Sequence, residues 1–577
     1  MKSLMVSLLL VQLATMTALG QTKAMGPADA IFVNGNVYPG ARLVAGPHGA
    51  LAAQVLPAAQ ALAVKDGRIL AIGANAEIRK LQGKQTQVVD LRGQFTMPGF
   101  NDAHVHLALG GFKILDVDLA GVASLVEMQQ RIAAKVKTSS PGEWIKGRGW
   151  DHTKWADQKL PARQDLDAVT QGHPAIFVRV DGHIAVANTE ALKMAGITPA
   201  TKAPQGGQFD LDAQGQLTGI LRERAAMNLV NDKIPPASSA RRREAIEVAL
   251  KDAAQHGLTS LQDSSLWEDF VIYEALERDG QLTARIYAWM PFNTPLETLQ
   301  QQRAHHPAND PMLRFGMLKG YMDGSLGSRT ATLLQPYSDD PKNSGLPQYE
   351  AAQLQKMSEE RAAAGFQIGF HAIGDQAAQM ALDAFADAER YAREHNPALA
   401  KAAADTFRFR IEHDQVITPD QFGQFRQLGV IASMQPNHLL TDMNWAEARI
   451  GPIRAKTSYP WKQFLTSGVP LAFGTDYPVE PITPFRGVYA AVTRQNEAGT
   501  KSYYVEQKLT IHEALAAYTT GAAYAEFAER QKGTLEPGML ADFVVLDRDL
   551  TKVQPPEILR TKVLRTVVGG KVVFQAD

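Results

Sequence analysis

The chain has 577 residues, of which 45% are hydrophobic and 21% are charged. This profile is typical of a globular protein, and the length exceeds that of one ordinary domain. The formal net charge of −1 gives no basic excess that would indicate binding to nucleic acid. The chain contains no cysteine, which excludes disulfides and cysteine-ligated zinc, so any metal site must use His, Asp, Glu or a modified Lys.

Residues 1–20 have the pattern of a secretory signal peptide. Lys2 gives a short positive start, the stretch from 4 to 19 is uncharged and mostly apolar or small, and Ala18 and Gly20 are small residues before a cleavage point at Gln21. The alternative interpretation is a buried N-terminal helix. The stretch is short for a membrane span, so no membrane anchor is expected. We expect a secreted protein, periplasmic if the host is a Gram-negative bacterium.

Both ends of the remaining chain are rich in strand-like segments. Residues 30–38 read as a strand and turn, residues 61–73 as a hairpin with Asp66-Gly67 as its tight turn, and residues 40–60 as a looser connection. Residues 542–547 and 563–574 are also strand-like, with a turn at Gly569-Gly570. The sequence therefore predicts one small β-sandwich domain built from residues 21–96 and 530–577.

The middle of the chain, residues 97–529, alternates short buried runs with helical stretches, which indicates a parallel α/β architecture. Counted with the run that ends at His104 and His106, there are eight strand-like runs, which fits a (β/α)₈ TIM-like barrel. The other seven runs are at residues 259–263, 284–289, 315–319, 367–371, 409–413, 430–434 and 471–476.

One interval between strand-like runs is much longer than the others. The stretch from His106 to Thr259 is several times longer than the ~30 residues of one βαβ unit. We expect an insertion at about residues 115–235, which would project over the catalytic face of the barrel as a candidate lid. Its tryptophans either line an apolar substrate pocket or form the core of the insertion; they are Trp144, Trp150 and Trp155.

Two histidines close the first barrel strand. His104 and His106 are at i and i+2, so on a strand both rings lie on the same side and can reach one ion, and imidazole suits zinc and similar metals. Lys319 ends another buried run, where a lysine is costly unless it is paired or modified. It either extends its amine to the barrel mouth or is carbamylated, in which case its carboxylate bridges two metals. Asp323 is the fallback ligand.

Three further residues lie at the ends of later strands. His371 and His413 each have the alternative role of a hydrogen-bonded core or cap histidine, and Asp476 that of a helix N-cap. Taken together with His104, His106 and Lys319, however, all six residues fall at the C-terminal ends of predicted strands, where barrel active sites lie. The set predicts a metal centre at the barrel mouth.

This pattern resembles the amidohydrolase superfamily, specifically the YtcJ-like branch that includes N-substituted formamide deformylases. The resemblance extends from about Ala30 to Phe574. It rests on residues 98–106, 323–331, 370–375, 411–413 and 474–478.

The resemblance implies a ligand set and a reaction. His104, His106 and Asp476 would hold the more buried metal, His371 and His413 the more exposed one, and carbamylated Lys319 would bridge them. Zinc is the default ion, with one or two per chain. Metal coordination lowers the pKa of water to about 7, and the resulting hydroxide would attack a carbonyl. Asp476 would accept the proton and pass it to the leaving nitrogen.

Three residues are candidates to bind the substrate or stabilise the oxyanion: His183, Arg329 and Gln435. For each, a structural hydrogen bond is the alternative role.

We therefore expect a metal-dependent hydrolase of a small-molecule, non-peptide C–N bond, in particular a linear amide such as an N-substituted formamide. The alternatives are a cyclic amidase, lactonase or esterase with the same site, and a metal-bearing binding protein without turnover. No nucleic acid or membrane partner is expected, and a homo-oligomer is left open.

Overall fold

The computed structural model describes residues 26–180, 182–204, 206–401, 403 and 406–577. The predicted signal peptide, residues 1–20, lies outside these ranges. Within them, no helix combines the length and apolar character needed to cross a membrane.

Eight parallel strands form the central barrel, hydrogen-bonded in the order β22-β21-β20-β19-β18-β17-β16-β9. All residues of the short strands β9, β20, β21 and β22 are buried, as expected for strands covered by helices on the outside and side chains within. The ring closes where Asp476 N donates to His104 O at 2.8 Å and His106 N donates to Tyr477 O at 2.7 Å. The predicted TIM-like barrel is therefore confirmed. Its strands are β9 (Phe100–Val105), β16 (Leu258–Ser264), β17 (Arg285–Pro291), β18 (Leu313–Tyr321), β19 (Ile368–Ala372), β20 (Arg410–His413), β21 (Ile431–Met434) and β22 (Leu471–Phe473).

Helices cover the outside of the barrel. Their ends follow local capping rules: in α12, Pro419 begins the helix after Thr418, whose backbone N–H donates to Gln421, and Gly429 ends it at φ 63°. The covering helices include α7 (Ser239–Gln255), α8 (Trp267–Arg278), α9 (Leu296–His305), α10 (Ala351–Ala363), α11 (Asp375–His395), α12 (Pro419–Leu428), α15 (Trp461–Thr466), α16 (Pro484–Thr493), α17 (Ile511–Ala516) and α18 (Ala522–Ala525). Two more, α13 (His438–Asp442) and α14 (Ala446–Ala455), follow β21.

The two ends of the chain meet in a β domain of two sheets. Phe32 and Phe543, from opposite ends, pack edge to face with ring centroids 4.9 Å apart in their shared core. The predicted turn at Asp66-Gly67 is present, with both residues at positive φ. One sheet has the order β6 (Arg68–Gly73), β5 (Ala61–Lys65), β1 (Ala30–Val33) and β7 (Gln87–Asp90). The other has the order β2 (Asn36–Val37), β8 (Phe95–Pro98), β23 (Phe543–Leu546), β24 (Val563–Val568) and β25 (Lys571–Gln575).

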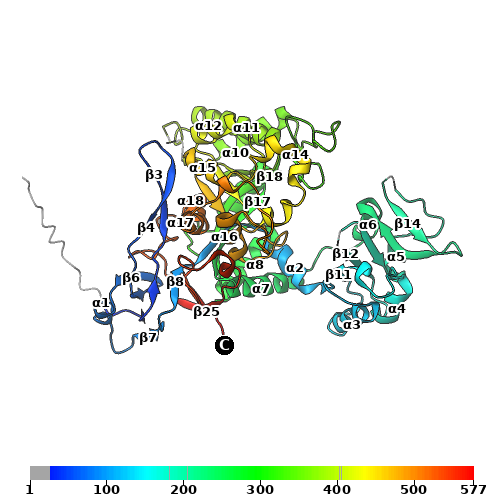
Figure 1. The fold of residues 1–577 in the computed structure, drawn as a ribbon, viewed down its shortest axis with the longest axis horizontal. Helices are drawn as coiled ribbons and strands as arrows, with labels where there is room; N and C mark the ends of the chain where they lie inside the picture. Colours follow the sequence, from blue (N-terminus) through cyan, green and yellow to red (C-terminus); the bar gives the residue numbers. More distant parts are fainter. Residues whose placement is uncertain (1–25, 181, 205, 402, 404–405) are drawn as a thin grey trace, which may run out of the picture.

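The segment read from the sequence as a loose connection, residues 40–60, contains a hairpin, so that prediction was wrong. Strands β3 (Ala41–Ala45) and β4 (Leu51–Val55) pair antiparallel in a two-stranded sheet. Figure 1 shows the hairpin rising along the barrel beside α17 and α18. Its sequence is rich in Ala, Gly and Pro and has little alternation, because the hairpin gains its burial from the barrel rather than from a sheet of its own.

The insertion after β9 forms a separate lobe around a six-stranded sheet. Its order is β10 (Val117–Asp118), β11 (Ile145–Trp150), β12 (Ala175–Arg179), β13 (Ile184–Ala187), β15 (Leu217–Arg222) and β14 (Gln208–Leu211). The helices of the lobe are α3 (Leu125–Val136), α4 (Arg163–Thr170), α5 (Thr189–Met194) and α6 (Glu223–Asn231). Trp150 and Trp155 are buried in one lobe core and Trp144 in another, so the tryptophans form the core of the insertion and do not line a substrate pocket.

The lobe and the β domain lie at opposite ends of the barrel (Figure 1). The chain passes from β8 in the β domain through β9 to α2 (Leu107–Leu115), which leads into the lobe. The lobe is therefore at the end where the barrel strands terminate. It joins the body through α2, which packs against α7, and through an ion pair between Arg241 and Glu143 at 3.5 Å.

Candidate metal centre

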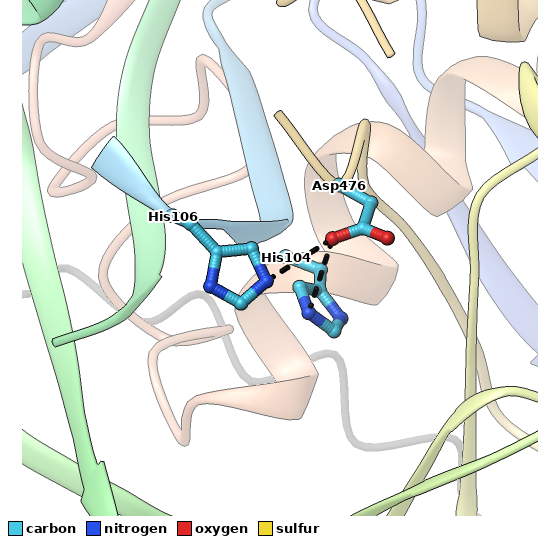
Figure 2. Close-up of side chains that lie close together, drawn as sticks. All are labelled: His104, His106 and Asp476. Atoms are coloured by element: carbon cyan, nitrogen blue, oxygen red, sulfur yellow. Dashed lines mark ion pairs between the residues drawn. The ribbon is translucent and has the colours of Figure 1, made fainter. Parts of the chain in front are cut away.

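Asp476 lies at the centre of a cluster of histidines at the barrel mouth. Its Oδ1 is 3.2 Å from His106 Nε2 and 3.6 Å from His104 Nε2, and its Oδ2 is 3.4 Å from His438 Nε2. Figure 2 shows the side chains of His104, His106 and Asp476 converging. His104 belongs to β9, His106 follows it directly, and Asp476 is three residues beyond the end of β22. The hydrogen bonds that close the barrel therefore also bring these residues together.

His371 and His413 extend the cluster along the next strands. They lie on the paired strands β19 and β20, and their ring centroids are 4.5 Å apart. The His413 ring is also 5.0 Å from that of His104 and 5.9 Å from that of His438. All the histidines predicted as ligands therefore share one site.

Lys319 reaches the same site from β18. The residue is 3% exposed, and its Nζ is 3.5 Å from His104 Nε2. It also lies 5.3 Å from the ring centroid of Tyr321. Burial lowers the pKa of the Lys319 amine to about 8, against the raising effect of Glu412 and Asp476.

Polar groups behind the histidines fix which ring nitrogen faces the cluster. His104 Nδ1 is 2.8 Å from Glu412 Oε2, and His371 Nε2 is 2.9 Å from Gly324 O. Carboxylate and carbonyl oxygens only accept hydrogen bonds, so these nitrogens carry the protons. His413 Nδ1 is 2.7 Å from Gln435 Oε1, whose amide nitrogen donates to Ser433 O. The opposite nitrogen of each ring is left with its lone pair, as metal ligation requires.

The protonation of the cluster also suits a cation. Burial, aided by the charge of Lys319, lowers the pKa of His104 to about 4 and of His371 to about 3. Burial likewise holds the pKa of His413 well below its usual range. Burial acts to raise the pKa of Asp476, but the facing histidines outweigh it and hold that pKa well below its usual range. Neutral imidazoles and an ionised carboxylate are the forms that bind metal.

Two atoms of the cluster have no hydrogen-bond partner among the described residues: Asp476 Oδ1 and His438 Nε2. Buried polar atoms are almost always satisfied, so an unpaired Asp476 Oδ1 that faces two imidazole nitrogens indicates a missing partner. His104, His106 and Asp476 offer ligand atoms that all lie within 4.8 Å of one another, and so do His413, His438 and Asp476. The donor set of imidazoles and one carboxylate fits a divalent metal.

The remaining predicted residues lie in other settings. The guanidinium of Arg329 is paired with Asp339, at 3.1 and 2.9 Å. Gln435 is buried as the partner of His413. His183 lies in the lobe between β12 and β13, with its side chain 67% exposed and its Nδ1 3.0 Å from Glu223. Asp323, the fallback ligand, accepts backbone N–H groups of Thr332, Ile373 and Gly374.

Sequence reasoning missed two residues of the centre, His438 and Glu412. His438 follows β21 at the start of α13, and a histidine in Gln435-Pro436-Asn437-His438, just after a predicted strand, was the available signal. Glu412 precedes His413 on β20, but the usual alternation of strand side chains would direct it away from the site. It contacts the centre through the ring of His104 instead.

An eight-stranded barrel with such a cluster at its mouth defines a class of metal-dependent hydrolases. The model of the Amidohydrolase family matches residues 87–574 of the chain. The protein therefore belongs to the amidohydrolase family, and it is a hydrolase acting on carbon–nitrogen bonds.

Individual relatives agree with this assignment. Protein LONG AFTER FAR-RED 3 of Arabidopsis thaliana is 34% identical, over 90% of this chain and 89% of that protein. Putative amidohydrolase YtcJ of Bacillus subtilis is 29% identical, over 89% and 96%. N-substituted formamide deformylase of Arthrobacter pascens is 27% identical, over 90% and 95%. These matches confirm the resemblance to the YtcJ-like branch.

A solved structure agrees as well. The crystal structure of an uncharacterized metal-dependent hydrolase from Pyrococcus horikoshii OT3 is 30% identical, with a TM-score of 0.72. The alignment covers 91% of this chain and 99% of that one.

Proposed function

We propose that the protein hydrolyses a linear amide of a small molecule, with N-substituted formamides as the first candidate class and zinc as the first candidate ion. The observation that carries the proposal is the position of Asp476, whose two carboxylate oxygens face three imidazoles. The name of the deformylase relative supports the choice of substrate class.

The proposed ligands divide into two groups. His104, His106 and Asp476 would hold one ion, and His371 and His413 a second. Lys319 would bridge them as a carbamate, formed when its neutral amine adds to carbon dioxide and loses a proton. Its burial and its lowered pKa favour the neutral amine that this addition needs. A bound divalent ion supplies a Lewis acid that polarises a carbonyl and makes water more acidic.

The chain's own residues would move the proton. Asp476 is ionised and can accept a proton from water, then deliver it to the leaving nitrogen. His438 Nε2, 3.4 Å from Asp476 Oδ2, can share that proton. Burial acts to lower the pKa of His438, but Asp476 raises it more, so the imidazole can also donate to an oxyanion.

His183, Arg329 and Gln435 remain proposed binding groups for the oxyanion, and each would first have to change its partner or its position. Gln435 and Arg329 would have to release His413 and Asp339, respectively. His183 would have to reach the mouth through an approach of the lobe to the barrel.

The test is hydrolysis by the purified, zinc-loaded protein of N-formyl amines, N-acyl amines, cyclic amides, lactones and aryl esters, with and without a chelator. We expect turnover of linear amides that the chelator abolishes. Asp476→Asn should lower kcat by about 10²- to 10⁴-fold, whereas Asp420→Asn, at an exposed position on α12, should not change it.

Each other outcome has a definite meaning. Turnover confined to cyclic amides or esters would replace the linear amide by that class. Bound zinc without any turnover would favour a binding protein, and turnover that survives the chelator would contradict the metal mechanism.

We also propose export, with residues 1–20 removed as a signal peptide. An N-terminus at Met1 in protein isolated from its host would contradict this.

A further inference from the structure

A second cluster of potential ligands lies at the other end of the barrel. Glu277 is in the last turn of α8, and His306 and Asp310 follow α9, in the segment that leads into β18. Helices in this fold run back along the strands, so these segments are at the N-terminal end of the barrel, away from Asp476. One ligand atom from each of the three residues lies within 4.8 Å of the other two.

The orientation of the His306 ring leaves one nitrogen facing this cluster. His306 Nδ1 is 2.8 Å from Glu274 Oε1 and must carry the proton that this carboxylate accepts. The side chain is only 8% exposed, and the edge-to-face contact with Phe270 restrains it further. A carboxylate that orients a histidine in this way is typical of metal-ligating histidines.

His306 Nε2 is a buried nitrogen with no hydrogen-bond partner among the residues described. Asp310 Oδ2 lies 3.6 Å away, which is too long for a hydrogen bond. A lone pair that faces a carboxylate is unfavourable unless a cation lies between them, so this nitrogen indicates a missing ligand.

The two carboxyl groups point to the same conclusion. Glu277 and Asp310 each bring a carboxylate oxygen within 4.8 Å of the same imidazole, so the cluster joins one nitrogen ligand to two negatively charged groups. Nearby arginines are engaged elsewhere: Arg278 contacts Asp279 and is 76% exposed, and Arg303 donates to backbone carbonyls of Gly365 and Ala364.

We propose that Glu277, His306 and Asp310 bind a divalent transition-metal ion, with zinc as the first candidate, at a structural site that joins α8 to the segment before β18. One imidazole and two carboxylates favour zinc-like ions over calcium or magnesium, which prefer oxygen ligands throughout. The site is at the end of the barrel associated with stability rather than catalysis, so its ion should affect unfolding and not turnover.

The experiment measures zinc per chain by mass spectrometry of the metal, after equilibration of the full-length protein with buffered free zinc. His306→Gln should bind one zinc fewer than the wild type and should lose part of the zinc-dependent rise in Tm. The matched control is His305→Gln. His305 also contacts Glu274, at 3.2 Å, but its side chain is 55% exposed and it does not belong to the cluster. This variant should keep the zinc content of the wild type.

A second variant tests whether a loss of zinc reflects the loss of a ligand or the loss of the fold. Asp310 Oδ1 accepts the backbone N–H groups of Met312 and Leu313, and Asp310→Asn keeps that acceptor while it removes the charge. It should also bind one zinc fewer, with at least a tenfold loss of affinity at this site.

Equal zinc content in the wild type, His306→Gln and Asp310→Asn would overturn the proposal. Such a result would identify His306 as a cation paired with Glu274 and Asp310. None of these readouts depends on hydrolysis, so the result is independent of the proposed amidase activity.

Discussion

Glu412 is a fully buried carboxylate that determines how His104 can bind a metal. Its Oε2 holds His104 Nδ1 at 2.8 Å, and its Oε1 is 2.9 Å from Arg410 Nε. Burial alone would raise the pKa of Glu412, but Arg410 and His104 outweigh it and lower that pKa to about 2, so the group is ionised. A negative charge on the far side of the ring makes His104 a stronger ligand.

Glu412→Gln tests this role, because it keeps the size of the side chain and removes its charge. We expect affinity for zinc at the mouth to fall by about 10- to 100-fold, measured by competition with a chromophoric chelator. Glu394→Gln, at an exposed position on α11, is the control and should bind as the wild type does. Unchanged affinity for zinc in Glu412→Gln would mean that the carboxylate only forms the ion pair with Arg410 and does not strengthen His104 as a ligand.

The positions of the strand-end residues could be predicted from the sequence, but several of their partners could not. His104, His106, Lys319, His371 and His413 end or follow buried apolar runs, and parallel strands bring such ends together. His438 follows its strand only after a turn, and the pairing of Glu412 with His104 joins residues 308 positions apart. Such contacts depend on three-dimensional packing, which has no local signal.

At the scale of elements, the seam between β9 and β22 is where the metal centre is built. Asp102 Oδ1 accepts the N–H groups of His104 and Thr475, and its Oδ2 accepts the Thr475 hydroxyl. Gly474 fits against this arrangement: a Cβ there would lie 2.5 Å from His104 N and 2.7 Å from Asp102 Oδ1. His104 N belongs to the backbone and the Asp102 carboxylate is held by three hydrogen bonds, so a larger residue must displace β9.

Gly474→Ala should therefore weaken the metal centre through the backbone. We expect a destabilisation of about 1–3 kcal/mol and loss of zinc binding at the mouth, measured by thermal unfolding and metal content. Gly423→Ala is the matched control, because Gly423 is inside α12 with no atom within 4 Å of an added Cβ. There the change should stabilise the helix, by up to about 1 kcal/mol. If Gly474→Ala kept full zinc content, the seam would tolerate displacement and would not position the ligands.

Elements of strong periodicity could be predicted, whereas their ends and the weakly patterned hairpin could not. The eighth run was expected to extend to Asp476, but β22 ends at Phe473, because the chain turns to bring Asp476 back to β9. That turn is imposed by pairing across the barrel and has no counterpart in the hydrophobic pattern.

At the scale of the whole molecule, the barrel is joined differently to its two neighbours. The β domain is continuous with the barrel through β8 and β9. A buried ion pair also joins them: Arg285 Nε and Nη2 lie 2.6 and 2.8 Å from the carboxylate of Asp542. The lobe has cores of its own and joins the body through α2 and α7. We expect the β domain to unfold with the barrel and the lobe to unfold separately.

Calorimetry should accordingly show two transitions, only one of which responds to metal. Zinc at 100 times its dissociation constant stabilises the folded barrel by about 2.7 kcal/mol, whereas no ligand group proposed for zinc lies in the lobe. Two variants identify the transitions. Trp150→Ala empties the lobe core and should lower the metal-insensitive transition, at a cost of about 3–5 kcal/mol. Arg285→Gln leaves Asp542 buried without its partner and should lower the metal-sensitive transition. A single transition that moves as a whole with zinc and with both variants would show that the lobe is coupled to the barrel, as closure over the mouth by His183 would require.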